Sequence, residues 1–332
     1  MANIGEATWI HHLPHDGPNA VRAVARRLAE AGFDAVIPCI KNPDGYADFQ
    51  SRVAKVRPEF ATWDPLATLC DEAKRVGLQV HAWCCVFPEG NGSNLIEQHP
   101  EYIARDPQNR EAVAPPHNIR WACSSRPEVQ DYEMALYQEL LENYDLTAVH
   151  LDYIRYSHPR NGFPTCYCAY CREEFQRQFD VDPVAIDEAH RHWGDWVDWR
   201  VAQITRFVEQ LRERANQAGK QVTAAVFPDY PNCVWEIGQD WEDWGRRGLV
   251  DVMMPMNYTM SADIAAKRAR NHRHALDSSV PLWEGLWHRK AMTTPMLVEQ
   301  IDRVLDQGAR GITIFEYFGL SDDDLAAIKA IG

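Results

Sequence analysis

Short apolar segments alternate with amphipathic helical segments along the whole sequence. The apolar segments predict eight strands, at residues 8–12, 35–40, 79–87, 148–153, 222–227, 250–256, 281–285 and 311–317. Helical periodicity between and after them predicts helices, the longest at residues 18–31, 65–76, 127–144, 193–218, 262–276 and 294–307. Eight strand–helix units in 332 residues are what one (β/α)8 barrel requires. We therefore predict a single TIM-barrel domain over residues 1–332.

The competing α/β architecture is a doubly wound parallel sheet. Such sheets often bind nucleotides through a glycine-rich phosphate loop. The sequence contains neither the G-x-G-x-x-G nor the G-x-x-x-x-G-K-[ST] pattern. The barrel is therefore the favoured interpretation.

The net charge of −14 argues against nucleic acid and anionic membranes as partners, because binding phosphate requires clustered lysine and arginine. No apolar run reaches the length that spans a bilayer. The first residues lack the basic and apolar regions of a signal peptide. We expect a cytoplasmic protein, or a secreted or periplasmic one if a leader has been removed. The oligomeric state is not predicted.

Polar side chains follow the predicted strands, where active sites of such barrels lie. Four of them are carboxylates and are candidate catalytic groups: Asp152, Asp229, Glu284 and Glu316. Other polar and aromatic side chains there are candidate substrate contacts: His12, His81, Trp83, Arg155, Tyr156, Asn257, Tyr258 and Trp287.

Paired carboxylates among aromatic rings meet the needs of glycoside hydrolysis, in which one acid protonates the leaving oxygen and a second carboxylate attacks or activates water. No G-x-S-x-G or H-E-x-x-H motif points to another hydrolase class. We predict a glycoside hydrolase that acts on a polysaccharide or oligosaccharide and needs no catalytic cofactor. Our hypothesis makes Asp152 the nucleophile or principal carboxylate, with Asp229 or Glu284 as the acid/base.

Structural roles for these residues remain open. Asp152 could pair with Arg155, Asp229 could be a turn residue, and Glu284 and Glu316 could form salt bridges.

Two other functions also remain open at this point. One is a carbohydrate-binding barrel without catalysis. The other is a metal-dependent hydrolase that uses His11, His12 and His81 with Asp152.

Several blocks of the sequence resemble the glycosyl-hydrolase-like family ten barrels. They are residues 148–156, 225–231, 238–241, 248–251 and 255–259, and their order and spacing agree with the family. The resemblance implies a bacterial polysaccharide-cleaving barrel, with cell-wall glycans among its substrates. It also implies Asp152 as the central carboxylate, Asp229 as the second, and Asn257 and Tyr258 as substrate contacts. Glu284 departs from the family pattern, where a small residue is expected.

Three of the nine cysteines, Cys166, Cys168 and Cys171, form a C-x-C-x-x-C pattern. They can place three thiolates on one ion, as a structural zinc site requires, and Cys123 is the candidate fourth ligand. This layout is similar to the structural zinc site of the family forty-two β-galactosidases. His158 is a rival fourth ligand, and free or partly oxidised thiols are the alternative.

Overall fold

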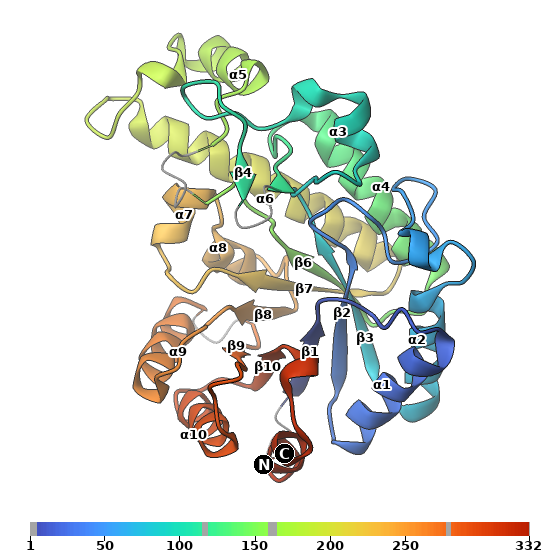
Figure 1. Cartoon of the computed structure of the whole chain (residues 1–332). Coiled ribbons are helices and arrows are strands. Elements are labelled where there is room, and N and C mark those ends of the chain that lie inside the picture. Colours follow the sequence, from blue (N-terminus) through green and yellow to red (C-terminus); the bar gives the residue numbers. More distant parts are fainter. Residues whose placement is uncertain (1–4, 115–118, 159–164, 277–279, 332) are drawn as a thin grey trace.

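The computed structural model describes residues 5–114, 119–158, 165–276 and 280–331, and its core is an eight-stranded parallel barrel (Figure 1). The strands are β1 (Gly5–Ile10), β2 (Ala35–Lys41), β3 (Gln79–Cys85), β6 (Ala148–Asp152), β7 (Gln221–Val226), β8 (Val252–Pro255), β9 (Trp283–Trp287) and β10 (Gly311–Phe315). They are ordered β8-β7-β6-β3-β2-β1-β10-β9. Parallel bridges Met253–Leu282 and Met256–Gly285 nearly close the circle between β8 and β9. The predicted barrel fold is confirmed.

The helices surround the strands (Figure 1). The larger ones are α1 (Pro18–Glu30), α2 (Pro65–Val76), α4 (Pro127–Asn143), α5 (Ala169–Phe179), α6 (Trp193–Gln217), α9 (Ala262–Leu276) and α10 (Thr294–Leu305). The shorter elements are α3 (Asn94–Gln98), α7 (Asn232–Ile237), α8 (Trp241–Arg246), α11 (Asp322–Lys329) and the antiparallel pair β4 (Val113–Ala114) and β5 (Ile119–Arg120). Within the described ranges, no helix combines the length and apolar character that crossing a membrane would require.

Local sequence signals explain where several helices begin and end. Asp64 caps α2, because its side chain accepts a hydrogen bond from the backbone N–H of Ala67. Gly77 ends the same helix in the left-handed conformation. Ser321 and Asp324 form a reciprocal capping box at the start of α11.

Side chains alternate between the barrel interior and the helix layer, as the two-residue period of a strand requires. Trp9 on β1, Trp83 on β3 and Met254 on β8 belong to one buried cluster inside the barrel, against which Trp283 on β9 packs. The next residue of β9, Glu284, therefore points toward the helices.

Gly285 occupies an interior position that has no room for a side chain. A Cβ atom there would lie 2.8 Å from the carbonyl oxygen of Pro255 and 2.9 Å from the indole ring of Trp9. We expect Gly285→Ala to lower the free energy of unfolding by about 1–3 kcal/mol through overpacking. Urea denaturation measures this, with Gly194→Ala as control, because a Cβ at Gly194 meets nothing within 4 Å. Equal stability of the two variants would contradict the expectation.

Candidate active site

A cavity of about 250 Å³ opens at the carboxyl ends of the strands. It is lined by Trp9, His11, Trp83, Cys85, Asp152, Tyr153, Arg155, Ala225, Met256, Tyr258 and Phe315. A larger cavity of about 650 Å³ is lined by residues at the amino ends of β1 and β9, including Gly5 and Trp283, and no carboxylate lines it. The chemistry that the sequence predicts therefore belongs to the smaller cavity.

Asp152 is the carboxylate inside this cavity. It is the last residue of β6, is only 5% exposed, and accepts a 2.6 Å hydrogen bond from the backbone N–H of Tyr153. Burial raises the pKa of Asp152 to about 6, although the positive charge of Arg155 and the Tyr153 N–H favour the ionised form. At neutral pH the group is mostly an anion, but one that is less stable than a solvated carboxylate.

Arg155 lies beside Asp152 and is 6% exposed. Its guanidinium lies 4.3 Å from the ring centre of Tyr153, 4.8 Å from Phe227 and 5.4 Å from Trp121. Its Nε and Nη1 atoms have no hydrogen-bond partner among the described residues. Buried donors in proteins usually have a hydrogen-bond partner. Two buried N–H groups without a protein partner are therefore available to an oxygen-rich ligand.

The floor of the cavity carries no charge. Trp9 donates from Nε1 to His150 Nε2 at 3.0 Å, so His150 bears its proton on Nδ1 and donates it to Thr223 Oγ1 at 2.8 Å. Burial holds the pKa of His150 well below its usual value. His150 is therefore a neutral group, and its hydrogen bond holds the indole of Trp9, which lines the cavity.

Aromatic rings form the walls. His11 stacks on Trp83 with ring centres 6.0 Å apart, and Tyr258 stacks on Phe315 at 5.7 Å. Phe315 also lies 6.4 Å from Trp83, so these rings form one continuous aromatic lining. Such a lining suits the ring of a sugar, whose faces are apolar and whose edge carries hydroxyl groups.

Glu316 and His12 lie next to this cavity. Glu316 follows Phe315, and its Oε2 accepts a 3.0 Å hydrogen bond from the backbone N–H of His11. His12 lines a neighbouring cavity of about 280 Å³ that also includes His11, Asn42, Pro43, Asp44, Gly90, Asn91 and Ile119. Burial and the adjacent His11 lower the pKa of His12. His11 lines both cavities, so the two are neighbours at the same end of the barrel.

Glu284 and Asn257 do not reach the cavity, contrary to the predicted position at the rim. Glu284 is fully buried and accepts from Asn257 Nδ2 at 2.8 Å and from His272 Nδ1 at 2.9 Å. His272 Nε2 donates to the carbonyl of Pro228 at 2.8 Å. Burial opposes a charge on His272, yet the Glu284 carboxylate raises its pKa above the usual value. This ion pair ties β9 to α9 and to the loop after β7.

Two other predicted contacts also lie away from the rim. His81 is near the amino end of β3, where its ring stacks on Trp283 at 6.4 Å. Tyr156 is in the outer core, 1% exposed, with its hydroxyl 2.8 Å from Ser125 Oγ. His81 is at the opposite end of the strand from the cavity. It therefore cannot bind the same metal ion as His11 and His12, contrary to the metal-dependent alternative.

Asp229 and Trp287 are outside the small cavity as well. The Asp229 side chain is 58% exposed, and its nearest cation is Arg268 at 3.8 Å. The guanidinium of Arg289 covers one face of Trp287 at 3.1 Å, and Tyr258 lies 5.6 Å away.

Six of the residues that line the cavity were not predicted: Trp9, Cys85, Tyr153, Ala225, Met256 and Phe315. The two-residue period of β1 places Trp9 on the same face as His11, which is a signal that the sequence contains. Phe315 similarly is the last interior position of β10. Tyr153 has a positive φ of 54°, a backbone conformation that is uncommon for a bulky residue. No sequence pattern predicts it.

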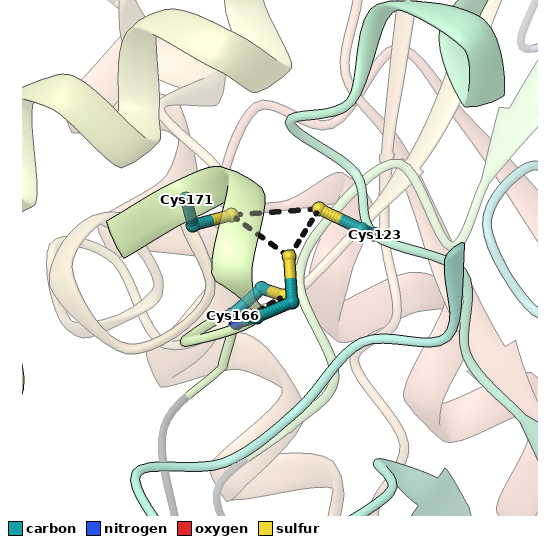
Figure 2. A group of neighbouring side chains, drawn as sticks. Cys123, Cys166 and Cys171 are labelled. Carbon is teal, nitrogen blue, oxygen red and sulfur yellow. Dashed lines mark hydrogen bonds between the residues drawn. The ribbon is translucent and has the colours of Figure 1, made fainter. Parts of the chain in front are cut away.

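The four predicted metal ligands come together outside the cavity. Cys123, Cys166, Cys168 and Cys171 are buried, and their sulfur atoms all lie within 4.8 Å of one another. Figure 2 shows the side chains of Cys123, on a loop, and Cys171, on α5, pointing toward each other. Among the described residues this is the one group of three or more His, Cys, Asp or Glu side chains able to hold an ion.

The fold and the site define a class: a glycosidase-like TIM barrel with a buried carboxylate at the end of the fourth barrel strand, β6. The family model of the glycosyl hydrolase-like 10 proteins matches residues 1–299, and the chain belongs to this family. The resemblance predicted from residues 148–156 and the later blocks is thus confirmed.

Two curated relatives match part of the chain. The glycosyl hydrolase YngK of Bacillus subtilis (strain 168) is 25% identical over 211 residues, covering 60% of this chain and 38% of the relative. An S-layer-related protein of Niallia circulans is 28% identical over 241 residues, covering 61% of this chain and 15% of the relative. The aligned part is less than half the length of either relative.

Three of the solved structures that share the fold are glycosidases. The α-L-fucosidase isoenzyme 2 of Paenibacillus thiaminolyticus superposes with a TM-score of 0.72 at 15% identity, over 98% of this chain and 48% of that one. The β-galactosidase of Marinomonas ef1 gives 0.71 at 10% identity, over 99% and 59%. The β-amylase catalytic domain of Paenibacillus polymyxa gives 0.68 at 10% identity, over 99% and 97%.

We expect Glu284→Gln to destabilise the fold rather than stop catalysis. The variant leaves His272 without its anion and sets an amide NH₂ against a neighbouring donor, a cost of about 1–3 kcal/mol. Urea denaturation and initial rates on a cleaved glycan measure both effects, with the exposed Glu299→Gln on α10 as control. Loss of activity at unchanged stability would contradict this assignment.

Proposed function

We propose that this chain hydrolyses glycosidic bonds in a polysaccharide or oligosaccharide, with ionised Asp152 as the central carboxylate. The observation that carries the proposal is a buried carboxylate, its pKa raised to about 6, within a cavity walled by aromatic rings. Membership of a glycosyl hydrolase-like family supports the reaction class.

In the proposed complex a sugar ring packs against the aromatic lining of the cavity, to which Trp83 and Tyr258 belong. The free N–H groups of Arg155 donate to its hydroxyl oxygens. Asp152 then faces the anomeric carbon, where positive charge develops as the glycosidic bond breaks. A poorly solvated carboxylate stabilises that charge more strongly than it stabilises the neutral substrate, which is the requirement for catalysis.

We propose Glu316 as the second carboxylate, in place of Asp229 or Glu284. In the barrel order, three strands separate β6 from β10 in either direction, so Asp152 and Glu316 stand at the ends of opposite strands. The hydrogen bond from the His11 N–H holds Glu316 next to a cavity residue. Glycoside cleavage needs a proton donor on one side of the scissile bond and a carboxylate anion on the other.

We propose a polymeric substrate, with bacterial cell-wall glycan as the first to test. The neighbouring cavity beyond His11 gives space for further sugar units beside the one that reacts. The family resemblance implies cell-wall substrates, and the name of the relative glycosyl hydrolase YngK supports the reaction class.

Asp152→Asn should lower kcat by at least about 10²–10⁴-fold, the range for a lost acid, base or charge-stabilising group. Release of new reducing ends from a glycan panel measures this. Binding of a glycan by the unsubstituted protein without any new reducing ends would instead favour the carbohydrate-binding barrel.

The same substitution should not destabilise the fold at neutral pH. The folded pKa of about 6 exceeds the usual 3.8, so ionising Asp152 opposes folding once the pH rises above about 4 and does so fully above about 6. Removing the charge can raise the free energy of unfolding by up to about 3 kcal/mol at pH 7. In the unsubstituted enzyme, kcat/KM should rise with pH through about 6; a fall there would give Asp152 the role of general acid.

Glu316→Gln should lower the rate on a natural glycan by about 10²–10⁴-fold, because the leaving oxygen loses its proton donor. The phenolate of an acidic phenol departs without protonation. The variant should therefore cleave an aryl glycoside of such a phenol at a rate much closer to that of the unsubstituted enzyme. Asp229→Asn is the comparison, and we expect it to keep its activity on both substrates. A large loss on the natural glycan in Asp229→Asn, with Glu316→Gln active, would return the acid role to Asp229.

A further inference from the structure

The four cysteines outside the cavity have the spacing of metal ligands. The sulfur of Cys123 lies 3.4 Å from that of Cys171 and 3.5 Å from that of Cys168, and Cys168 lies 3.7 Å from Cys171. A tetrahedral zinc ion with Zn–S bonds of about 2.3 Å separates its sulfurs by about 3.8 Å. A disulfide would need about 2.05 Å, so these distances fit a shared ion and not a covalent bond.

The surroundings of the cluster also fit a thiolate-bound cation. All four side chains are buried, between 0% and 3% exposed. The backbone N–H of Cys168 lies 3.5 Å from Cys166 Sγ and donates to it, the kind of outer contact that orients a thiolate ligand. An all-sulfur set of four favours zinc and leaves no position open for substrate.

We propose that Cys123, Cys166, Cys168 and Cys171 bind a structural zinc ion. The ion would join three segments: the loop before α4, the loop after β6, and the first turn of α5. His158, the rival fourth ligand, is not needed, because its described ion-pair partner is Glu236 at 3.7 Å and four sulfurs complete the shell.

The loop that carries Cys123 also holds Arg155, and this places the ion behind the cavity wall. Ser124 Oγ donates to the backbone carbonyl of Arg155 at 3.4 Å. The ring of Trp121, two residues before Cys123, lies 5.4 Å from the Arg155 guanidinium. The zinc would therefore position the β6 loop without touching substrate.

Elemental analysis of the full chain, purified without chelator, tests the site. We expect about one zinc per chain. Cys166→Ser and Cys171→Ser should lose it, and Cys70→Ser should keep it, because Cys70 is equally buried but lies on α2 outside the cluster. Chelation should lower the melting temperature of the unsubstituted protein and of Cys70→Ser, since a ligand that binds the folded state stabilises it.

Absence of zinc after purification with zinc supplied, iron in its place, or full zinc retention in Cys166→Ser would each overturn the proposal. If the serine variants do not fold, cobalt exchanged into the unsubstituted protein decides. Tetrahedral thiolate-bound cobalt gives intense visible bands with sulfur charge transfer, and their absence would overturn the site. None of these readouts depends on glycan cleavage, so they stand apart from the proposed hydrolase activity.

Discussion

The carboxylate of Asp152 is removed from water at the end of β6, a transfer that costs several kcal/mol unless neighbouring groups replace the lost hydration. Neighbouring groups do so in part, chief among them the positive charge of Arg155 and the backbone N–H of Tyr153. The compensation is incomplete, because the pKa stays raised to about 6. His150 is neutral and adds no charge. The site thus holds an anion that gains stability when positive charge appears nearby, which is the property we assign to its chemistry.

Keeping Arg155 in place requires two loops that are distant in sequence. The rings of Trp121 and Tyr153 enclose its guanidinium, and Ser124 holds its backbone. One loop follows β3 and the other follows β6, and the helices around them gather on the same side of the barrel (top of Figure 1). The cysteine cluster joins the same two loops. We infer that the cluster stabilises the wall on which the buried charge depends.

The barrel could be predicted because its strands are buried on both faces and read as short, mostly apolar runs that alternate with helical segments. Residues near the strand ends, such as Trp83 and Tyr258, line the cavity as expected. The end of a strand fixes both their position along the barrel axis and the side of the sheet on which they lie. Which side of the sheet the Glu284 side chain occupies depends on the register of β9. The position of His81 along the barrel axis depends on the length of β3. Local sequence sets neither. Helix α5 is not among the helices predicted above, because the cysteines obscure its weak apolar period.

The most direct test is the crystal structure of the Asp152→Asn protein with an uncleaved oligosaccharide. We expect a sugar ring against the aromatic lining of the cavity, with its anomeric carbon facing residue 152. Arg155 Nε and Nη1 should donate to the sugar oxygens, and Glu316 should lie on the opposite side of the scissile bond. An oligosaccharide bound away from residue 152, or one whose scissile bond faces Asp229, would contradict this expectation.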